Sequence, residues 1–398
     1  MAGAVPRRAA PVHSGRSGQG VTVTDPPRVT VAGSLSEVEP ARWASLATGW
    51  PVELSHAWLR AEEGRTAAAQ WYLLAWRPDG RLLGALAAYL FDGPITHTAY
   101  PVQSVLRGTS QDLDPALHPS LVCVAPGSYR PGLLSDRTLD AESTTRVREA
   151  LLTAFEEHAR GLGCAAISVM HVSGGDTGLA GLLAGRGYAK ALVSADAVLR
   201  VPAGSFPDYL ATLPPDRRRK VRRERRTFLD SGVTVHAGGA ELLTESLAPL
   251  LVDHYRRYGH PADERGVLDR FHRVRRQGEL RVFLARAGDE IAGFSAFFTD
   301  GADRLVGRLY AARSAGAFEY FNLVYYEPIT AAARDGIRAI HYGSESFDAK
   351  VFRGCTLRPL YGHFGSVAGD AGTLSRMAYE RCVAERTRLR DFVPHLAE

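Results

Sequence analysis

The chain has 398 residues, 45% of them apolar and 23% charged, a length and balance typical of a globular protein with two domains. It contains no run of eighteen apolar residues and no paired cysteine spacing, so we expect no membrane span, disulfide framework or metal site, but a cytoplasmic protein. The formal net charge of +5 is concentrated: eight of the ten residues 217–226 are Lys or Arg, and the remainder carries 40 basic (48 less 8) and 42 acidic (43 less 1) residues. A local charge of this kind predicts an acidic or phosphorylated partner.

The elements of the first half are predicted in chain order. Residues 1–27 predict a disordered leader, because the first twenty are rich in Ala, Gly, Arg and Ser and lack the apolar segment of a secretory signal. A strand, a turn and a helix follow over 29–59, with Ser55 as the helix N-cap. Residues 71–90 contain two apolar runs separated by Pro-Asp-Gly-Arg, which indicates a β-hairpin. The pattern over 92–131 is too irregular to assign.

Regular elements resume after that stretch. We expect an amphipathic helix over 144–162, a buried strand over 165–170, a short helix over 179–183 and a strand over 195–201.

The same order of elements recurs in the second half. Residues 281–298 contain two apolar runs broken by Gly-Asp-Glu, and Gly84 of the first hairpin aligns with Gly293. A strand over 303–310, a helix over 318–334 and a strand over 336–341 follow. This repetition indicates an internal duplication and a mixed α/β fold of two lobes, each a partly antiparallel sheet flanked by helices. The expected divisions are lobes at 28–203 and 204–370, then a helical tail at 371–398.

Three segments together carry a resemblance to a known family: LPPDRRRKVRRERR at 213–226, FEYFNLVYYEPI at 318–329 and YGSESFDAKVFRG at 342–354. The chain resembles the GNAT acyltransferases related to the Fem peptidoglycan-bridge enzymes, many of which act in actinobacterial natural-product pathways. The resemblance covers roughly 29–364. It implies two tandem GNAT-like lobes, amide formation between an activated acyl group and an amine acceptor, and a role in antibiotic or other secondary-metabolite biosynthesis.

The resemblance leaves the acyl donor open. Members use an acyl thioester on a carrier protein or on coenzyme A, or an aminoacyl-tRNA. The pyrophosphate loop R/Q-x-x-G-x-G/A is only half present, at Arg313 and Gly316, because Phe318 replaces its last small residue. This disfavours free coenzyme A. The expected donor group is therefore the phosphopantetheine thioester of an acyl carrier protein, with no bound cofactor.

Two alternatives to this function remain. The first is an aminoacyl-tRNA-dependent transferase of Fem type, although the sequence lacks the heptad run of the coiled-coil arm that many Fem enzymes use for tRNA. The second is a non-catalytic nucleic-acid-binding protein, which would need aromatic residues interleaved with the basic ones, and 217–226 contains none.

Amide formation requires a neutral amine, and therefore a group that takes its proton. His341 ends a predicted strand, and Glu345 follows in the next loop, where active-site groups tend to gather in α/β folds. His341 is the candidate base and Glu345 the candidate group that orients it or holds the ammonium. The alternative is that His341 has no catalytic role and is simply the outward-facing strand residue that alternates with Ile340.

The helix over 318–334 predicts one aromatic core face and one polar face. The polar face combines a carboxylate, an amide and a phenol, which are costly to bury without a ligand, so we expect it to line the acceptor pocket. The motif at 347–354 adds two cations, which we expect to bind a phosphate or a carboxylate of the substrate. The alternative is that they form only surface ion pairs. The candidate substrate-binding residues are Glu319, Tyr320, Asn322, Tyr326, Lys350 and Arg353.

The basic segment predicts a helix with cations on every face, docked only through Val221, Phe228 and Leu229. An acyl carrier protein presents an acidic helix to such a surface, and a tRNA presents phosphates; a solvated helix is the third reading. The amides around Gly316 and Ala317 are expected to be open to an anion. The candidate donor-binding residues are Arg217, Arg218, Arg219, Lys220, Arg222, Arg223, Arg226, Arg313 and Gly316.

Overall fold

The structure is a computed structural model that describes residues 21–94, 100–108, 112–313, 316–368 and 370–393. The first twenty residues of the expected leader lie outside this range. The rest of that segment packs on the first lobe: Val23 is buried, and the Val21 N–H donates to the Thr138 carbonyl at 2.8 Å.

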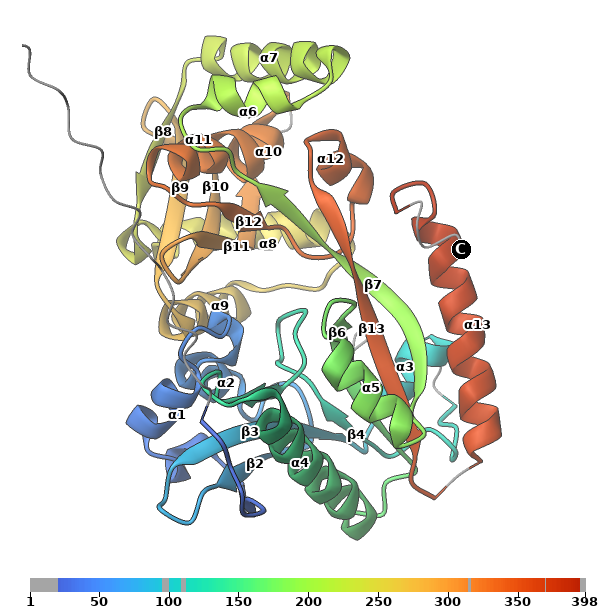
Figure 1. Ribbon diagram of the computed structural model, residues 1–398. Coiled ribbons are helices and arrows are strands. Elements are labelled where there is room, and N and C mark those ends of the chain that lie inside the picture. The colour runs from blue at the N-terminus through green and yellow to red at the C-terminus, as the bar shows by residue number, and fades with distance from the viewer. Residues whose placement is uncertain (1–20, 95–99, 109–111, 314–315, 369, 394–398) are drawn as a thin grey trace, which may run out of the picture.

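One sheet of thirteen strands runs through both lobes (Figure 1), in the order β1-β2-β3-β4-β6-β13-β7-β12-β11-β10-β9-β8, with β5 paired to β3. From either edge inward, the pairings are three antiparallel, one parallel and one antiparallel, and the two halves meet at the antiparallel pair β13–β7. The sheet is therefore built as two equivalent halves, which confirms the expected mixed α/β fold of two lobes.

The first lobe contains the elements up to β7. Its strands are β1 (Arg28–Ala32), β2 (Ala69–Trp76), β3 (Leu82–Phe91), β4 (Ser120–Cys123), β5 (Leu133–Ser135), β6 (Ala166–Ser173) and β7 (Ala189–Arg200). Its helices are α1 (Pro40–Leu46), α2 (His56–Glu62), α3 (Val102–Arg107), α4 (Ala141–Gly161) and α5 (Thr177–Gly185), with short 3₁₀ turns η1 (Leu35–Glu37) and η2 (Val52–Leu54).

The second lobe contains the remaining elements. Its strands are β8 (Val233–Gly238), β9 (Leu280–Ala287), β10 (Glu290–Asp300), β11 (Arg304–Ala312), β12 (Ala339–His341) and β13 (Thr356–Ser366). Its helices are α6 (Phe206–Thr212), α7 (Pro215–Asp230), α8 (Ala248–Arg257), α9 (Glu264–Gln277), α10 (Glu319–Phe321), α11 (Glu327–Arg334), α12 (Phe347–Phe352) and α13 (Ala371–Leu389). Short turns η3 (Ala240–Leu242) and η4 (Glu245–Leu247) precede α8, and a π-helical segment η5 (Asn322–Tyr326) joins α10 to α11.

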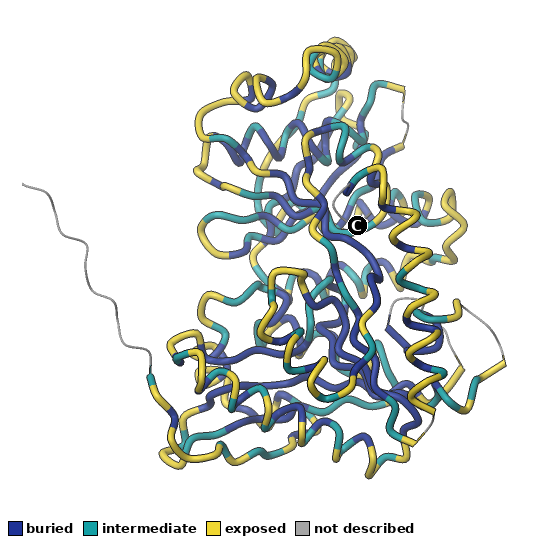
Figure 2. The backbone as a smooth tube through the Cα atoms, turned by 45° about the vertical axis from the view of Figure 1, so that its right-hand side comes forward, coloured by how far each residue is buried: buried dark blue, intermediate teal, exposed yellow. Residues whose placement is uncertain are grey.

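The two central strands are exchanged between the lobes. β7 leaves the first lobe to pair with β12 and β13, while β13 comes from the second half of the chain and pairs with β6 and β7. Figure 1 shows these two long strands crossing from one lobe to the other, with α13 beside them. Figure 2 shows that the same strands run through the middle of the molecule and are mostly buried.

The predicted duplication has a physical counterpart at the two aligned glycines. A Cβ atom on Gly84 would lie 2.6 Å from Val147 of α4, and one on Gly293 would lie 2.9 Å from Leu323 of η5. In both lobes, therefore, the second strand of the hairpin passes directly beneath the helix that precedes the parallel strand, and only glycine leaves room for that approach. Both predicted hairpins are confirmed.

The helix expected over 318–334 contains a feature that the sequence pattern did not predict. Its middle turn is π-helical, and the Ser295 hydroxyl donates to the Leu323 carbonyl at 2.6 Å within the core. The wider turn brings Asn322, Tyr325 and Tyr326 all to complete burial, so the separate polar face drawn at 3.6 residues per turn is wrong.

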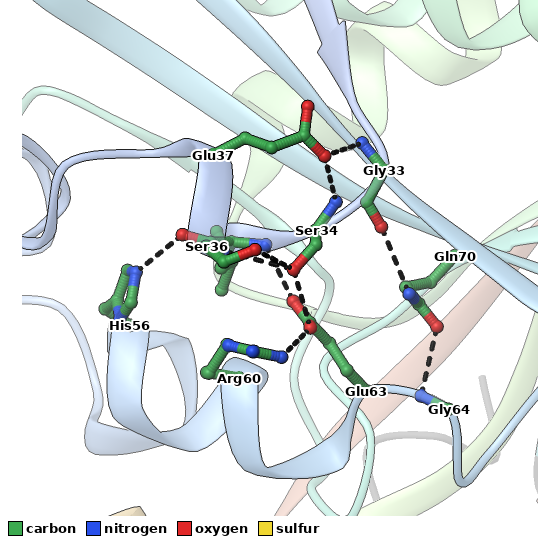
Figure 3. A network of polar contacts seen from close by, with 10 residues as sticks. Gly33, Ser34, Ser36, Glu37, His56, Arg60, Glu63, Gly64 and Gln70 are labelled. Atoms are coloured by element: carbon green, nitrogen blue, oxygen red, sulfur yellow. Dashed lines mark hydrogen bonds and ion pairs between the residues drawn. The ribbon is translucent and has the colours of Figure 1, made fainter.

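The start of the first lobe is fixed by a polar network around α2 (Figure 3). The Ser55 side chain caps α2, as predicted, by accepting from the Trp58 N–H at 3.2 Å. The Glu63 carboxylate accepts from the Leu35 N–H at 2.7 Å and from the Ser34 hydroxyl at 3.0 Å, and His56 contacts the Leu35 carbonyl at 3.0 Å. These contacts hold the helix that carries Trp58 and Glu62 toward the second lobe.

None of the helices in the described ranges combines the length and the apolar character needed to cross a membrane.

Candidate functional site

A cavity of about 350 Å³ lies where the two lobes meet. The first lobe contributes Trp58 of α2, the loop between β4 and β5, and the facing side chains of β6 and β7. The second lobe contributes β11 and the end of β12. The residues in its wall are Glu53, Trp58, Tyr100, Gly127, Ser128, Tyr129, Arg130, His171, Asp196, Val306, Gly307, Arg308, His341, Tyr342 and Gly343.

The structure pairs His341 with Asp196 across the strand exchange. His341 Nδ1 lies 2.8 Å from Asp196 Oδ2, and both residues are almost fully buried. Burial raises the pKa of Asp196, but the hydrogen bond and charge of His341 and the charge of Arg130 outweigh it and hold that pKa below its usual range. An ionised carboxylate only accepts, so Nδ1 carries the proton and Nε2 is left as the basic nitrogen.

Arg130 and Glu53 extend this cluster. Arg130 Nη2 lies 3.3 Å from His341 Nδ1 and 3.8 Å from Asp196 Oδ2, and Arg130 Nε lies 3.7 Å from Glu53 Oε1. Since the protonated Nδ1 is a donor, the 3.3 Å approach is a close contact and not a hydrogen bond. Burial raises the pKa of Glu53 despite the opposing charge of Arg130. The cluster thus contains two carboxyl groups and one guanidinium, and the guanidinium of Arg130 approaches the two carboxyl groups only to 3.7 and 3.8 Å.

The loop that carries Arg130 is pinned at several points. Trp58 Nε1 donates to the Pro126 carbonyl at 2.7 Å, the Gly127 N–H donates to the Tyr100 hydroxyl at 2.8 Å, and Arg308 donates to the Gly127 carbonyl at 2.7 Å. Gly127 has a φ of +70°, and a Cβ there would lie 3.0 Å from Arg308 Nη2. Glycine is therefore required both by the turn and by the approach of the guanidinium.

Arg308, also in the cavity wall, belongs to a second charged cluster. The Arg308 guanidinium stacks over the Trp58 ring at 5.1 Å and lies 3.7 Å from Glu62, which also pairs with Arg273 at 3.3 Å and accepts from Gln277 at 2.5 Å. Burial is the main cause that lowers the pKa of Arg308, to about 10, and nearby arginines add to it. In this cluster, one carboxylate that is not in the cavity wall is shared between two guanidiniums.

A second cavity of about 690 Å³ adjoins the first, with Tyr129 and His171 in the walls of both. Their rings meet edge to face with centroids 5.6 Å apart. His171 lies at a β-bulge of β6, where it adopts a left-handed φ of 60°, and burial lowers its pKa to about 4. A strained, neutral histidine thus separates the two cavities.

Glu345, the predicted partner of His341, lines the second cavity instead. It is exposed, adopts a φ of 68°, and lies 3.4 Å from Arg388 of α13. No contact in the described part of the chain joins it to His341, whose carboxylate neighbour is Asp196.

Lys350 is buried and fixes the loop that follows His341. Its ammonium donates to the carbonyls of Tyr342, Gly343 and Ser344 at 2.9, 3.0 and 2.7 Å, and burial lowers its pKa to about 8. A Cβ on Gly343 would lie 2.6 Å from the Tyr129 ring, so this loop packs closely against the first lobe. The alternative of a surface ion pair for Lys350 is wrong, because its three acceptors are backbone carbonyls.

Three of the other predicted substrate-binding residues lie beneath the basic helix. Arg353 Nη2 donates to Glu224 of α7 at 2.7 Å and Arg353 Nε to the Tyr326 hydroxyl at 3.1 Å, and Tyr326 donates to the same carboxylate. Asn322 lies 3.5 Å from the Glu224 carbonyl. All four are buried, and the surface alternative for Arg353 is also wrong. None of them is in the wall of the inter-lobe cavity.

The basic helix α7 has two different sides. Its inner side docks through Val221, Glu224 and Phe228, all fully buried, whereas Leu229 is 55% exposed because it lies a further 100° around the helix. The predicted docking role of Leu229 is therefore wrong. On the outer side, cations follow one another at intervals of one or three residues and form what we call the basic stripe: Arg218, Arg219, Arg222, Arg223 and Arg226.

The remaining basic residues of α7 face its neighbours. Arg217 donates to the Val351 carbonyl at 2.8 Å and stacks on Phe352, which Lys220 also approaches at 4.9 Å. Figure 1 shows α7 along the far end of the second lobe, away from the first.

The half-formed phosphate loop is partly engaged by the protein itself. Arg313 Nε donates to the Ile291 carbonyl at 2.7 Å, and the Ala317 N–H donates to Glu319 at 3.1 Å, so that amide is not open as predicted. Gly316 is exposed, and a Cβ added to it would have no atom of the described residues beyond its chain neighbours within 4 Å. Tyr320 packs on Tyr310 with ring centroids 5.0 Å apart. Residues 314 and 315 lie outside the described ranges.

Sequence reasoning missed the first-lobe half of the site. Asp196, Arg130 and Glu53 all lie far from His341 in the sequence. Asp196 meets it because β7 pairs with β12, while Arg130 comes from the loop between β4 and β5 and Glu53 from η2. One signal was available for Asp196, because it is the only charged residue between Lys190 and Arg200 in a mostly apolar strand. An unpaired charge is not left in a buried strand without a partner.

Comparisons with known proteins agree with this architecture. A family model described as FemAB-like, peptidoglycan biosynthesis/recognition, matches residues 34–365. The crystal structure of FemX is 12% identical with a TM-score of 0.55, over 81% of this chain and 93% of that one. The C-terminal domain of a putative lysylphosphatidylglycerol synthetase from Agrobacterium fabrum is 11% identical with a TM-score of 0.52, over 89% and 98%.

A tandem GNAT protein from the clavulanic acid biosynthesis pathway is 14% identical with a TM-score of 0.48, over 86% of this chain and 99% of that one. At such identities, the structural likeness to FemX and to the synthetase domain concerns the fold alone. Among the curated proteins compared with the chain, none matches it.

Proposed function

We propose, from the premise that the chain belongs to the FemAB-like family, that it is an acyltransferase that joins an activated acyl group to an amine as an amide. The observation that carries the proposal is the His341–Asp196 pair at 2.8 Å in the wall of a cavity between the lobes. A buried histidine oriented by a carboxylate, next to a space for a small molecule, is the arrangement of a general base.

The chemistry at this pair is a single acyl transfer. The acceptor amine attacks the carbonyl carbon of the donor thioester, and its proton passes to His341 Nε2. The C–S bond then breaks, and the imidazolium returns the proton to the departing thiolate. Asp196 remains ionised throughout and balances the transient positive charge on His341.

We propose an acyl carrier protein as the donor, in a secondary-metabolite pathway. The basic stripe of α7 supports this: it is about 12 Å long at 1.5 Å per residue, which suits one acidic helix of a partner. Arg222, Arg223 and Arg226 make no ion pair within the described residues. The donor's phosphopantetheine would carry the thioester, and we propose no other cofactor.

An aminoacyl-tRNA is the second candidate donor, because the matched family includes the Fem-type proteins. Phosphates would also pair with the basic stripe, but a tRNA would make its binding strongly dependent on salt and sensitive to RNase.

The test is an assay of amide product by mass spectrometry with acylated carrier proteins, charged tRNAs and acyl-CoAs as donors. We expect product from carrier-bound thioesters, loss of that product in the variant Arg222→Glu/Arg223→Glu, and an unchanged thermal unfolding midpoint. Unaltered turnover with the charge-reversed enzyme would refute docking at α7. If amide product forms only with charged tRNAs, the donor is an aminoacyl-tRNA and not an acyl carrier protein.

A further inference from the structure

The floor of the second cavity is built by two β-bulges. The pairing with β13 shifts register at residues 170 and 171 of β6 and at residues 193 and 194 of β7. In a regular strand, consecutive side chains point to opposite faces of the sheet, but both members of each of these pairs lie in the wall of this one cavity. Bulges re-aim side chains in this way next to active sites, so the floor is a built feature of the fold.

The second cavity has an apolar side to which four elements contribute. The residues are Val105 and Leu106 of α3, Met170 of β6, Val193 of β7 and Ala384 of α13. Val105 and Leu106 are only partly buried, and Ala384 is exposed. Apolar side chains that surround a space without filling it leave a surface on which an apolar group gains free energy by leaving water.

The two arginines of the second cavity already have partners. Arg107 pairs with Asp114 at 2.6 Å, and Arg381 pairs with Glu385 at 3.1 Å. Arg381 also donates to the Val193 carbonyl at 3.0 Å. Guanidiniums recognise a phosphate through paired hydrogen bonds, and both guanidiniums here are committed to carboxylates. The second cavity therefore suits an uncharged chain better than a phosphate or pyrophosphate group.

The second cavity begins close to the candidate base. Ser194 in its wall lies two residues before Asp196 on the same face of β7, and the pairing with β13 is regular between them. Two residues of a strand correspond to about 7 Å. The rings of Tyr129 and His171 lie in the walls of both cavities. A chain that extends from an acyl carbonyl at His341 along β7 therefore reaches the second cavity beside these two rings.

We propose that the second cavity binds the aliphatic chain of the acyl group and selects donors by the length of that chain. A donor docked on the basic stripe approaches from the far end of the second lobe (Figure 1), so the acyl end of its arm faces the first lobe, which contributes most of this cavity. An acetyl group ends in the first cavity, whereas a chain of medium length enters the second. This inference rests on the proposed function, because it names the class of acyl group in that reaction.

The experiment measures the binding of acyl chains of increasing length without transfer. The probes are amide analogues of acetyl-, butyryl-, hexanoyl-, octanoyl- and decanoyl-N-acetylcysteamine, in which nitrogen replaces the thioester sulfur so that the acyl group cannot leave. Each methylene buried in the cavity should tighten binding about fourfold, measured by isothermal titration calorimetry, until the cavity is full. The matching thioesters are then assayed as donors, with amino acids and straight-chain alkylamines as acceptors, and their kcat/KM should follow the same order.

Three substitutions assign the effect to the cavity. Ala384→Phe places a ring in the cavity wall and is expected to abolish the gain in affinity beyond butyryl. Val193→Ala enlarges the floor and should shift the preferred chain to a longer one. Val383→Phe adds a ring to the neighbouring exposed position of α13, which is not in the cavity wall, and should change neither the affinities nor the thermal unfolding midpoint.

Two results would overturn the proposal: an affinity that does not depend on chain length, or the same dependence in Ala384→Phe as in the unaltered protein. So would a length dependence shown by the alkylamines and not by the acyl probes, because it would assign the cavity to the acceptor. Chain-dependent binding without amide from any thioester would support the occupant of the cavity and count against the proposed function.

Discussion

At the scale of single residues, mutation can decide whether Asp196 or Glu345 is the carboxylate that acts together with His341. Asp196 is buried and hydrogen-bonded to His341, whereas Glu345 is exposed and paired with Arg388. Replacing Asp196 with Asn keeps the shape but removes the charge that fixes the proton on Nδ1 and stabilises the imidazolium. We expect Asp196→Asn to lower kcat by about 10²-fold or more, with little change in KM.

The matched comparison for that measurement is Glu345→Gln. If its rate with saturating substrates equals that of the unaltered enzyme while Asp196→Asn is impaired, Asp196 is the functional partner of His341. The opposite pattern would restore the role that the sequence first suggested for Glu345.

A second prediction concerns the buried histidine His363 of β13. Neither of its nitrogens has a hydrogen-bond partner in the described residues, and burial, helped by Lys190, lowers its pKa to about 4. A histidine whose pKa is lowered on folding stabilises the protein fully above pH 6.5, and this stabilisation is lost as the pH falls from 6.5 to 4, because the unfolded chain binds the proton first. The contribution is on the order of 3 kcal/mol.

Urea unfolding at pH 7 and at pH 4.5 measures this contribution. The unaltered protein should lose more stability between the two pH values than His363→Phe, whereas the exposed control His236→Gln should lose as much as the unaltered protein. Equal losses in all three proteins would mean that His363 does not titrate as its burial requires.

At the scale of elements, α7 combines an outer face proposed for binding with an inner face that holds the lobe together. The Glu224–Arg353 ion pair has almost no exposed surface, and Arg353 also stacks on Phe321 at 3.5 Å. Removing one partner leaves an uncompensated buried charge. We expect Arg353→Met to lower the free energy of unfolding by about 3–5 kcal/mol, measured by urea denaturation.

The control for this prediction is on the outer side of α7. Arg223→Met removes an exposed cation and should change stability by less than about 0.5 kcal/mol. If both variants unfold alike, the buried pair contributes nothing beyond a surface charge. The double variant Glu224→Leu/Arg353→Met should recover much of the loss, since it removes both charges together.

The elements also show where sequence patterns are sufficient. The two hairpins were predictable because each strand is a short apolar run bounded by a turn, and that pattern is local. The π turn over Asn322–Tyr326 was not, because its apolar and polar residues fit either spacing and the deciding contact, from Ser295, lies on another strand. Likewise, the sequence of residues 345–353 does not show whether Lys350 binds a ligand or, as in the structure, donates to three backbone carbonyls.

At the scale of the whole molecule, the strand exchange explains why half of the candidate site was beyond sequence reasoning. His341 lies on β12, and β12 pairs with β7 of the other lobe, so its neighbours are set by a pairing across 145 residues. A periodic pattern predicts which face of a strand is buried, but not which distant strand lies next to it. The lobes themselves were predictable because their repetition is visible in the chain.

The exchange also makes a prediction about the boundary placed between residues 203 and 204. In a fragment of residues 1–203, β7 would have neither of its neighbours, since both β12 and β13 belong to the other half. In a fragment of 204–398, β13 would lack both β6 and β7. Each fragment exposes unpaired backbone along its longest strands, so we expect each alone to aggregate or to remain largely unfolded.

Mixing the two fragments should restore the fold, because the sheet needs the strands and not the covalent link between them. The link itself is short and partly exposed around Gly204. We expect co-refolded fragments to form a 1:1 complex with the circular dichroism spectrum of the intact chain and an unfolding midpoint that rises with concentration. Isolated fragments that each fold and unfold cooperatively would show that the lobes are independent domains, and would contradict the exchange of β7 and β13.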